Sequence, residues 1–269
     1  MIQLQVLISA YGAKGIQSVA SLPHPEVEGV SYLVSWQYAD DSPEIPRSLL
    51  DRKDFTVIPT STRGLSINRN LALEASSAPL LLLGDDDIIY SREYLLAVIE
   101  AFRSHPDVDF ICFRYKSERH PVDHPVSELR LTKPPWWLIS FCMAFRRDVI
   151  EKSGVRFDER FGIGAEFPSA EESVFLNDLL RKGIKALYLP VTVAEHPGAT
   201  TVMRTETMPD FISAKAAAFV KIYPLTWPMR MITHALRFSD SMKERQRYIS
   251  IWLDAVRRFR QKPHGRKKS

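Results

Sequence analysis

The chain has 269 residues, 45% hydrophobic and 25% charged, so it can bury a sizeable core and lies near the upper size of a single α/β domain. Its apolar runs are too short for a membrane span, and residues 1–9 lack a charged leader, so neither a span nor a cleaved signal peptide is expected. The formal charge of +4 is uneven, because residues 257–269 hold 7 of the 36 cations and no acid. The remainder has 29 cations and 32 acids, and this mildly acidic body argues against a nucleic-acid-binding protein.

Strand and helix patterns alternate along most of the chain. Extended apolar segments are expected at 4–11, 30–36, 55–59, 80–83, 108–113 and 184–193. A glycine-bearing turn is expected to end the first strand at 12–15, and helical patterns occur at 66–77, 94–102 and 171–183. This alternation predicts an α/β fold with a mostly parallel central sheet flanked by helices.

The helix expected at 66–77 has an unusual first turn. Ser66 fits an N-cap, with Leu65 just outside it as a hydrophobic staple. Arg69 is poorly placed near this end, because the helix dipole there favours anions. An anionic ligand would explain the arginine, although ordinary solvation of a surface residue would also accommodate it.

Three consecutive carboxylates, Asp85, Asp86 and Asp87, follow the strand expected at 80–83. Adjacent negative charges repel one another unless they lie in water or a cation sits among them. Alternation along an extended chain would send Asp85 and Asp87 to one side, able to share an ion, and Asp86 to the other. Open α/β sheets bind ligands beyond the carboxyl ends of their strands, where this triplet falls. The alternative is a solvated loop before a helix that Ser91 caps.

Glu171 and Glu172 are paired acids at the start of another expected helix. Neighbouring carboxylates can raise one another's pKa into the range useful for a general base. Ser169 lies three residues before Glu172, a capping-box pattern that would occupy the same carboxylate. The residues alone leave both interpretations open.

His196 follows the last expected strand and could bind a metal there, although a lone histidine is more often a surface or hydrogen-bonded residue. Trp136 and Trp137 come after an irregular, proline-rich stretch at 116–135. Two tryptophans can form a platform for a sugar ring or a lipid anchor, or they can pack in the core.

The C-terminal part is expected to form helices at 211–223, 228–238 and 249–259. The last of these, with the basic tail 257–269, could lie on an anionic membrane, or it could be an ordinary packed helix with a solvated tail. Cys112 and Cys142 lie in apolar surroundings without metal-type spacing, so they are expected to be buried free thiols.

Six motifs, in this order, resemble those of family-2 glycosyltransferases with the GT-A fold. They are Ser9-Ala10-Tyr11, residues 64–73, residues 83–87, residues 157–162, Glu171-Glu172 with residues 179–183, and His196. The resemblance covers roughly residues 1–200. It implies a GT-A-type catalytic domain at 1–205. The C-terminal region departs from the catalytic core of the family and is expected to form a helical extension packed on it at 206–256, followed by a basic, disordered tail at 257–269.

The resemblance implies transfer of a sugar from a nucleoside-diphosphate donor to an acceptor hydroxyl, with inversion at the anomeric carbon. Asp87 and Asp85 would then hold Mn²⁺ or Mg²⁺, and His196 would be a third ligand. A hard cation would stabilise the charge of the departing diphosphate. Glu172 would be the first choice as the base that takes the acceptor proton, and Glu171 the second.

The family resemblance also implies a set of residues around the donor nucleotide, namely Ser9, Tyr11, Gln37, Arg69, Asp85 and Asp86. The family often has an aspartate where this chain reads Ser35-Trp36-Gln37, so Gln37 is expected to supply amide hydrogen bonds instead. Trp136 and Trp137 would contact a saccharide or lipid-linked saccharide acceptor.

By the same resemblance the protein would assemble cell-surface polysaccharide or glycolipid on the cytoplasmic side, peripheral to the membrane through its basic tail. Two other classes of function are alternatives. A nucleotidyltransferase would need a phosphate-binding loop after the first strand, of which residues 12–15 are only a faint version. A non-catalytic module would bind membrane or nucleic acid through the tail.

Overall fold

The computed structural model describes residues 3–38, 44–117, 123–135, 137–197, 208–239 and 241–261. Its sheet has eight strands in the order β3-β2-β1-β4-β7-β5-β8-β6. The strands are β1 (Leu4–Tyr11), β2 (Val30–Gln37), β3 (Phe55–Thr60), β4 (Leu80–Asp85), β5 (Phe110–Lys116), β6 (Leu129–Leu131), β7 (Met143–Arg146) and β8 (Ala186–Glu195). The helices are α1 (Gly12–Ser21), α2 (Arg47–Leu50), α3 (Leu65–Ala75), α4 (Arg92–Ser104), η1 (Ser140–Cys142), α5 (Arg147–Ser153), α6 (Glu171–Arg181), α7 (Pro209–Ile222), α8 (Trp227–Phe238) and α9 (Met242–Arg260).

The sheet is mostly parallel, as the sequence predicts. Strands β3, β2, β1 and β4 run parallel to one another, and β5 runs parallel to β8. Strand β7 lies antiparallel between β4 and β5, and the short β6 is antiparallel to β8 at the edge. The two antiparallel strands were not expected, because they come from stretches without a strand-like pattern.

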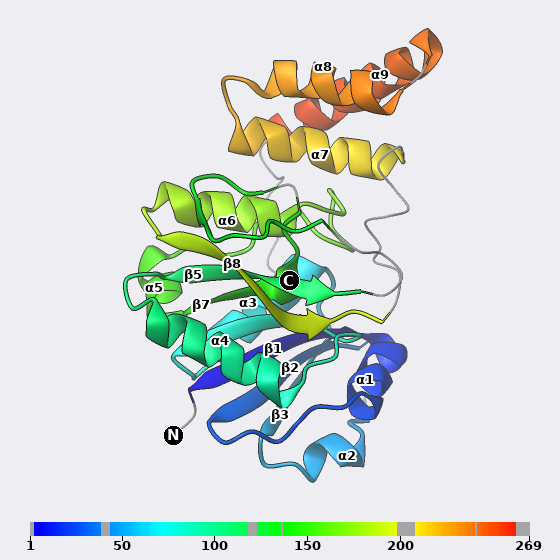
Figure 1. Ribbon diagram of the computed structural model, residues 1–269. Coiled ribbons are helices and arrows are strands. Elements are labelled where there is room, and N and C mark those ends of the chain that lie inside the picture. Colours follow the sequence, from blue (N-terminus) through cyan, green and yellow to red (C-terminus); the bar gives the residue numbers. More distant parts are fainter. Residues whose placement is uncertain are drawn as a thin grey trace.

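Helices cover both faces of the sheet, which makes three layers (Figure 1). One core cluster packs α1 and α4 against one face, with Ile16 and Val98 among its members. A second cluster packs α3, α5 and α6 against the other face, with Leu73 and Phe175 among its members. The four leucines of β4 alternate between the two clusters, so this strand is buried on both faces.

Helices α7, α8 and α9 form a separate layer beyond α6 (Figure 1). Their buried side chains share a third core cluster with Phe161, Phe167 and Val174 of the part that precedes them. Helix α7 is alanine-rich and buried over much of its length, because it lies between α6 and the outer helices. The helical extension is therefore packed on the α/β part through a core of its own.

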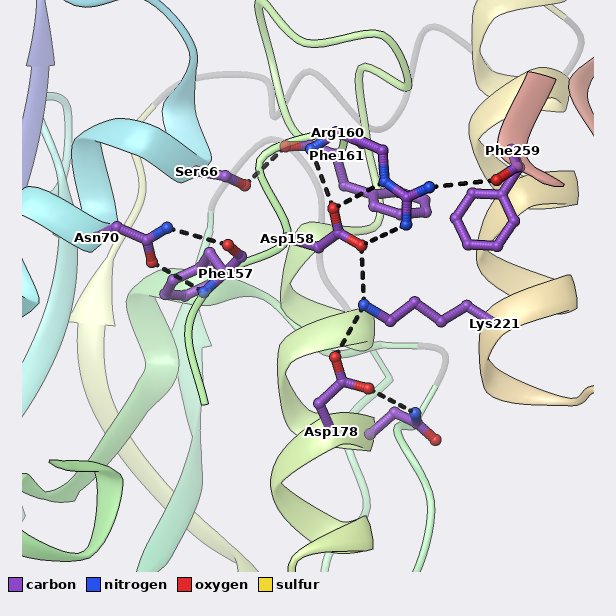
Figure 2. A network of polar contacts seen from close by, with 10 residues as sticks. Ser66, Asn70, Phe157, Asp158, Arg160, Phe161, Asp178, Lys221 and Phe259 are labelled. Atoms are coloured by element: carbon purple, nitrogen blue, oxygen red, sulfur yellow. Dashed lines mark hydrogen bonds and ion pairs between the residues drawn. The ribbon is translucent and has the colours of Figure 1, made fainter. Parts of the chain in front are cut away.

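The segment 157–161 joins these layers, as Figure 2 shows. The Asn70 side chain of α3 donates to the Phe157 carbonyl (3.0 Å) and accepts from the Phe157 amide (2.8 Å). Asp158 accepts from Arg160 (2.9 Å) and from Lys221 of α7 (2.8 Å). Arg160 in turn donates to the carbonyl of Phe259 in α9 (3.2 Å) and lies over its ring. The segment thus connects α3 to two of the C-terminal helices, α7 and α9.

Several local predictions are confirmed. Ser91 caps α4, its hydroxyl accepting from the Tyr94 amide at 3.2 Å. Cys112 and Cys142 are buried free cysteines. A separate observation is that no helix in the part of the chain that the structure describes is both long and apolar enough to cross a membrane.

Other local predictions are wrong. The expected turn at 12–15 is the first turn of α1. Helix α3 begins at Leu65 after Gly64, and the Ser66 hydroxyl donates to the Phe161 carbonyl at 2.6 Å instead of capping. Helix α9 continues to Arg260, so the first residues assigned to a disordered tail are helical, while 262–269 lie outside the described residues.

We expect Asp158→Asn to lower the free energy of unfolding by about 1–3 kcal/mol, because charged hydrogen bonds from Arg160 and Lys221 are lost. Burial acts to raise the pKa of Asp158, but these bonds outweigh it and lower the pKa to about 2. The stabilisation is therefore complete above the ordinary value of 3.8 and is lost as the pH falls toward 2. Urea unfolding at pH 7 and pH 3 measures both effects.

Asp148→Asn on α5 is the matched control, because Asp148 pairs with Lys152 where both side chains are exposed. Its effect should stay within about 0.5 kcal/mol. Equal effects of the two substitutions would contradict a linking role for Asp158.

Candidate active site

Parallel strands β1, β2 and β4 end close together, and polar side chains near their carboxyl ends face α3. Ser9 of β1 lies in register with Ser35 of β2 and Asp85 of β4. Strand alternation puts these three on the same face as Leu7, Leu33 and Leu83, which pack in the core cluster shared with α3. The carboxyl edge of the sheet thus presents polar groups to the first turns of α3.

Arg69 of α3 lies at the centre of this edge, and its side chain is only 2% exposed. Its guanidinium donates to Asp85 Oδ1 (3.1 Å), Glu171 Oε1 (2.9 Å) and Ser140 Oγ (2.7 Å). Ser140 also donates to Asp85 Oδ2 at 3.4 Å. A buried cation requires such partners, because burying an unpaired charge is costly. In the described structure Arg69 thus lies between two acids, and a contact between Arg69 and the donor nucleotide stays a prediction.

The three aspartates of the triplet have different surroundings, because β4 ends at Asp85 and a turn follows. Burial raises the pKa of Asp85, with the charge of Arg69 acting in the opposite direction. The sequence indicated that Asp85 and Asp87 lie on the same side of one extended strand. The structure differs, because Asp85 ends β4 and Asp87 lies in the turn that follows.

Asp86 is turned toward α1. A Cβ atom at Gly15 would lie 2.3 Å from Asp86 Oδ2, so this carboxylate fills space that only glycine leaves free. It also accepts a hydrogen bond from the backbone of Tyr11. Burial, followed by the charges of Asp87 and Asp85, raises the pKa of Asp86 to about 6. In the described structure Asp86 thus contacts the junction between β1 and α1. That Asp86 also contacts the donor nucleotide stays a prediction.

Asp87 meets His196 at the rim of the site. Asp87 Oδ2 lies 3.3 Å from His196 Nε2, and the Asp87 side chain is 54% exposed whereas His196 is buried. His196 stacks on Phe141 of η1, and paired backbone bonds between Ile89 and Glu195 hold the adjoining segments together. Asp87, in the turn after β4, therefore lies beside His196 at the end of β8.

The Asp87–His196 pair suits a hard divalent cation in chemical type, since it offers one exposed carboxylate and one imidazole. Among the described residues no group of three or more His, Cys, Asp or Glu side chains is placed to hold a metal. The expected trio of Asp85, Asp87 and His196 is therefore only partly assembled, with Asp85 bonded to Arg69. Any cation here would need further oxygen ligands from water or a ligand.

Glu171 and Glu172 open α6, and the structure separates their roles. Glu171 is buried against Arg69. Burial, then the adjacent charge of Glu171, raises the pKa of Glu172. The Glu172 Oε2 atom is buried and has no hydrogen-bond partner among the described residues.

The capping box expected from Ser169 and Glu172 is not formed. Helix α6 starts at Glu171, and its N-cap is Ala170, in a left-handed conformation with φ of 72° and without a side-chain capping bond. The Glu172 carboxylate is therefore not occupied by a capping box with Ser169.

The residues expected around the donor base have mixed surroundings. Gln37 is buried and donates to Thr62 Oγ1 (3.1 Å) and the Gly64 carbonyl (3.2 Å), so its amide nitrogen is bonded within the protein. Tyr11 is exposed at the end of β1. The Ser9 hydroxyl is buried without a partner among the described residues, as is Asn68 Oδ1 of α3.

The expected acceptor residues are not brought to the site by the described contacts. Trp137 packs against Tyr188 with ring centroids 4.6 Å apart and also against His124, at the margin of a core cluster. Trp136 lies outside the described residues. An acceptor role for this pair stays a prediction.

Ser140, Phe141 and Asn68 belong to the site and were missed by sequence reasoning. Ser140 and Phe141 lie in a short 3-10 turn with no motif, and Asn68 lies in a helix whose N-cap was expected at Ser66, two residues after the observed N-cap Gly64. Only the position of Asn68, one residue before Arg69, offered a signal.

The sequence pattern of the family described as "Glycosyl transferase family 2" matches residues 16–157, more than half of the chain. The chain belongs to this family. The description of the family makes sugar transfer the activity to propose for this chain. None of the curated proteins compared with it is similar enough in sequence to count as a relative.

Solved structures agree with the fold of this glycosyltransferase. S. aureus TarS superposes with a TM-score of 0.62 at 16% identity, covering 95% of this chain and 49% of TarS. TarS 1-349 in complex with UDP-GlcNAc gives 0.62 at 16% identity, covering 96% and 80%. The mannosyltransferase PcManGT from Pyrobaculum calidifontis, in complex with GDP-Man and Mn²⁺, gives 0.57 at 14% identity, covering 95% and 74%. The chain thus has the GT-A-like fold and spans about half the length of the longer TarS chain.

We expect Arg69→Met to destabilise the protein by about 3–5 kcal/mol, because the buried Glu171 and the partly buried Asp85 would be left without their cation. Urea unfolding measures the loss. Arg69→Met combined with Asp85→Asn and Glu171→Gln should recover much of it, since the unpaired charges are then removed. A triple variant no more stable than Arg69→Met would show that the ion pairs are not the cause.

Proposed function

We propose that the protein is an inverting, metal-dependent hexosyl- or N-acetylhexosaminyltransferase that moves a sugar from a nucleoside-diphosphate sugar to an acceptor hydroxyl. The observation that carries the proposal is the network around Arg69, which joins Asp85 at the strand edge to Glu171, the neighbour of Glu172. One buried cation thereby positions an acid of the aspartate motif and the start of the helix that bears the base.

Glu172 is the proposed base. Inversion in a single displacement requires the acceptor oxygen to attack the anomeric carbon while the diphosphate leaves from the opposite side and a base takes the hydroxyl proton. Glu172 suits this role because burial and Glu171 raise its pKa, and because no capping box occupies its carboxylate. Glu171 is the less suitable candidate, since its carboxylate is bonded to Arg69.

Asp87 and His196 are the proposed protein ligands of Mn²⁺ or Mg²⁺, with Asp85 held nearer the donor ribose by Arg69 and Ser140. When bound, such an ion supplies electrostatic stabilisation of the charge that develops on the diphosphate. The exposed side chain of Asp87 leaves room for phosphate and water oxygens to complete the coordination shell.

The donor, the acceptor and the location belong to the same proposal. TarS and PcManGT were solved with different donors, UDP-GlcNAc and GDP-Man, so both nucleotides are candidates here. Ser9, Tyr11 and Gln37 lie at the strand ends where the nucleoside is expected. We propose a saccharide or lipid-linked saccharide acceptor in cell-surface polysaccharide or glycolipid assembly, on the cytoplasmic face of a membrane.

We expect a thermal-shift screen of UDP-, GDP-, dTDP- and CMP-sugars to show stabilisation by one nucleotide class that depends on Mn²⁺. Asp87→Ala should abolish the Mn²⁺-dependent part of this shift, because it removes the exposed carboxylate of the pair. Asp107→Ala is the matched control, since Asp107 is 55% exposed and lies in a peripheral ion pair. Nucleotide binding by Asp87→Ala that still responds to Mn²⁺ would refute the proposed metal site.

We expect Glu172→Gln to lower kcat by about 10²–10⁴-fold, the usual contribution of general-base catalysis, with donor binding retained. In the unsubstituted enzyme, the rate should increase with pH above the ordinary carboxyl value of 4.5, because a base with a raised pKa loses its proton only at higher pH. Initial rates across pH with Glu172→Gln, and with Glu151→Gln on the exposed surface of α5 as control, measure both effects. Full activity of Glu172→Gln would assign the base elsewhere.

A further inference from the structure

Exposed apolar side chains are concentrated on the two outer helices. Of the 15 large hydrophobic residues that are exposed in the described part of the chain, seven lie between 225 and 253. These seven are Leu225, Met229, Ile232, Leu236, Met242, Ile249 and Leu253. Leu225 precedes α8, and the exposed sides of α8 and α9 that bear the other six are together called the outer face below. Scattered exposed apolar residues need no explanation, but a contiguous set marks an interaction surface.

On α8 these residues form a stripe that points away from the protein. Met229, Ile232 and Leu236 recur at spacings of three and four residues, so they share one side of the helix. The residues of α8 that enter the third core cluster, Met231 and Ala235, lie on the other side. Packing against α7 and α9 therefore accounts for only one of the two apolar sides of α8.

Helix α9 repeats the arrangement. Met242, Ile249 and Leu253 share one side of the helix, away from the buried Tyr248 and Ala255 and next to the buried Trp252 and Val256. A shallow depression runs along this side, lined by Gln246, Ile249, Ser250, Leu253, Asp254 and Arg257. Both helices belong to the layer farthest from the sheet (Figure 1), so their outer sides are available to a partner.

Positive charge accompanies the apolar residues. Residues 225–261 carry 8 cations and 3 acids, a balance of +5, whereas residues 1–224 carry 24 cations and 29 acids, a balance of −5. On the described helices Arg237, Lys243, Arg247 and Arg257 are exposed. The chain therefore has a basic, apolar end and an acidic catalytic end.

We propose that the outer face of α8 and α9 docks on an anionic lipid bilayer, with the apolar stripes among the acyl chains and the cations among the headgroups. Amphipathic helices with basic flanks bind anionic membranes by burial of apolar area together with electrostatic attraction. A second copy of the chain fits less well, because a two-fold contact would place this strongly positive face against itself. The inference does not depend on the proposed sugar transfer and needs no residue of the basic tail beyond α9.

The test is co-sedimentation of the full chain with vesicles of phosphatidylcholine alone or with one part in three of phosphatidylglycerol. We expect binding only to the anionic vesicles, weakened by salt. Ile232→Gln with Leu236→Gln should lower the partition coefficient about tenfold or more, because two apolar side chains leave the bilayer. Leu50→Gln with Val126→Gln is the matched control, since both residues are exposed and apolar but lie elsewhere.

Lys243→Gln with Arg247→Gln should weaken binding about fivefold for each cation lost. Arg181→Gln with Lys182→Gln, at the exposed end of α6, is the corresponding control.

Equal binding to both vesicle types, no binding to either, or equal loss in control and outer-face variants would overturn the proposal. The proposal would also be overturned if light scattering showed a dimer that Ile232→Gln with Leu236→Gln disrupts, while co-sedimentation with vesicles stayed unchanged. Nucleotide binding is measured separately, so failure of this surface and failure of the proposed catalysis are distinguishable.

Discussion

The burial of one guanidinium, that of Arg69, is the constraint on which the candidate site depends. An arginine keeps its proton in a protein, so its burial is tolerable only with acceptors and opposite charge around it. Those groups come from β4, η1 and α6, which are separated from α3 by up to 102 residues along the chain. Their convergence fixes the start of α3 against the carboxyl edge of the sheet.

This arrangement also explains how two adjacent glutamates acquire different properties. Glu171 is bonded to the guanidinium, while Glu172 lies next to a negative charge in a poorly solvated position. Burial and repulsion both favour the neutral form of Glu172. The ion pair with Arg69 therefore gives Glu171 a structural role. It leaves Glu172 with a raised pKa that suits the proposed general base.

The segment 157–161 connects the candidate site to the C-terminal helices. It is bonded to α3 through Asn70 and Ser66, and to the C-terminal helices through Asp158 and Arg160. The edge of the sheet that bears the candidate site and the basic helical layer are thus parts of one packed body. An acidic body with a basic, apolar end has an electrostatic polarity that would orient it above an anionic surface.

The sequence by itself determined the parallel strands, the helix cap at Ser91 and the buried thiols, because hydrophobic periodicity and local capping act over a few residues. It also carried the motifs of the family. Only the tertiary structure decided that Arg69 faces inward, that Glu172 forms no capping box, and that Ser140 completes the network. It likewise inserted β7 between two parallel strands. These features arise from contacts between residues far apart in the chain, whose partners no local pattern specifies.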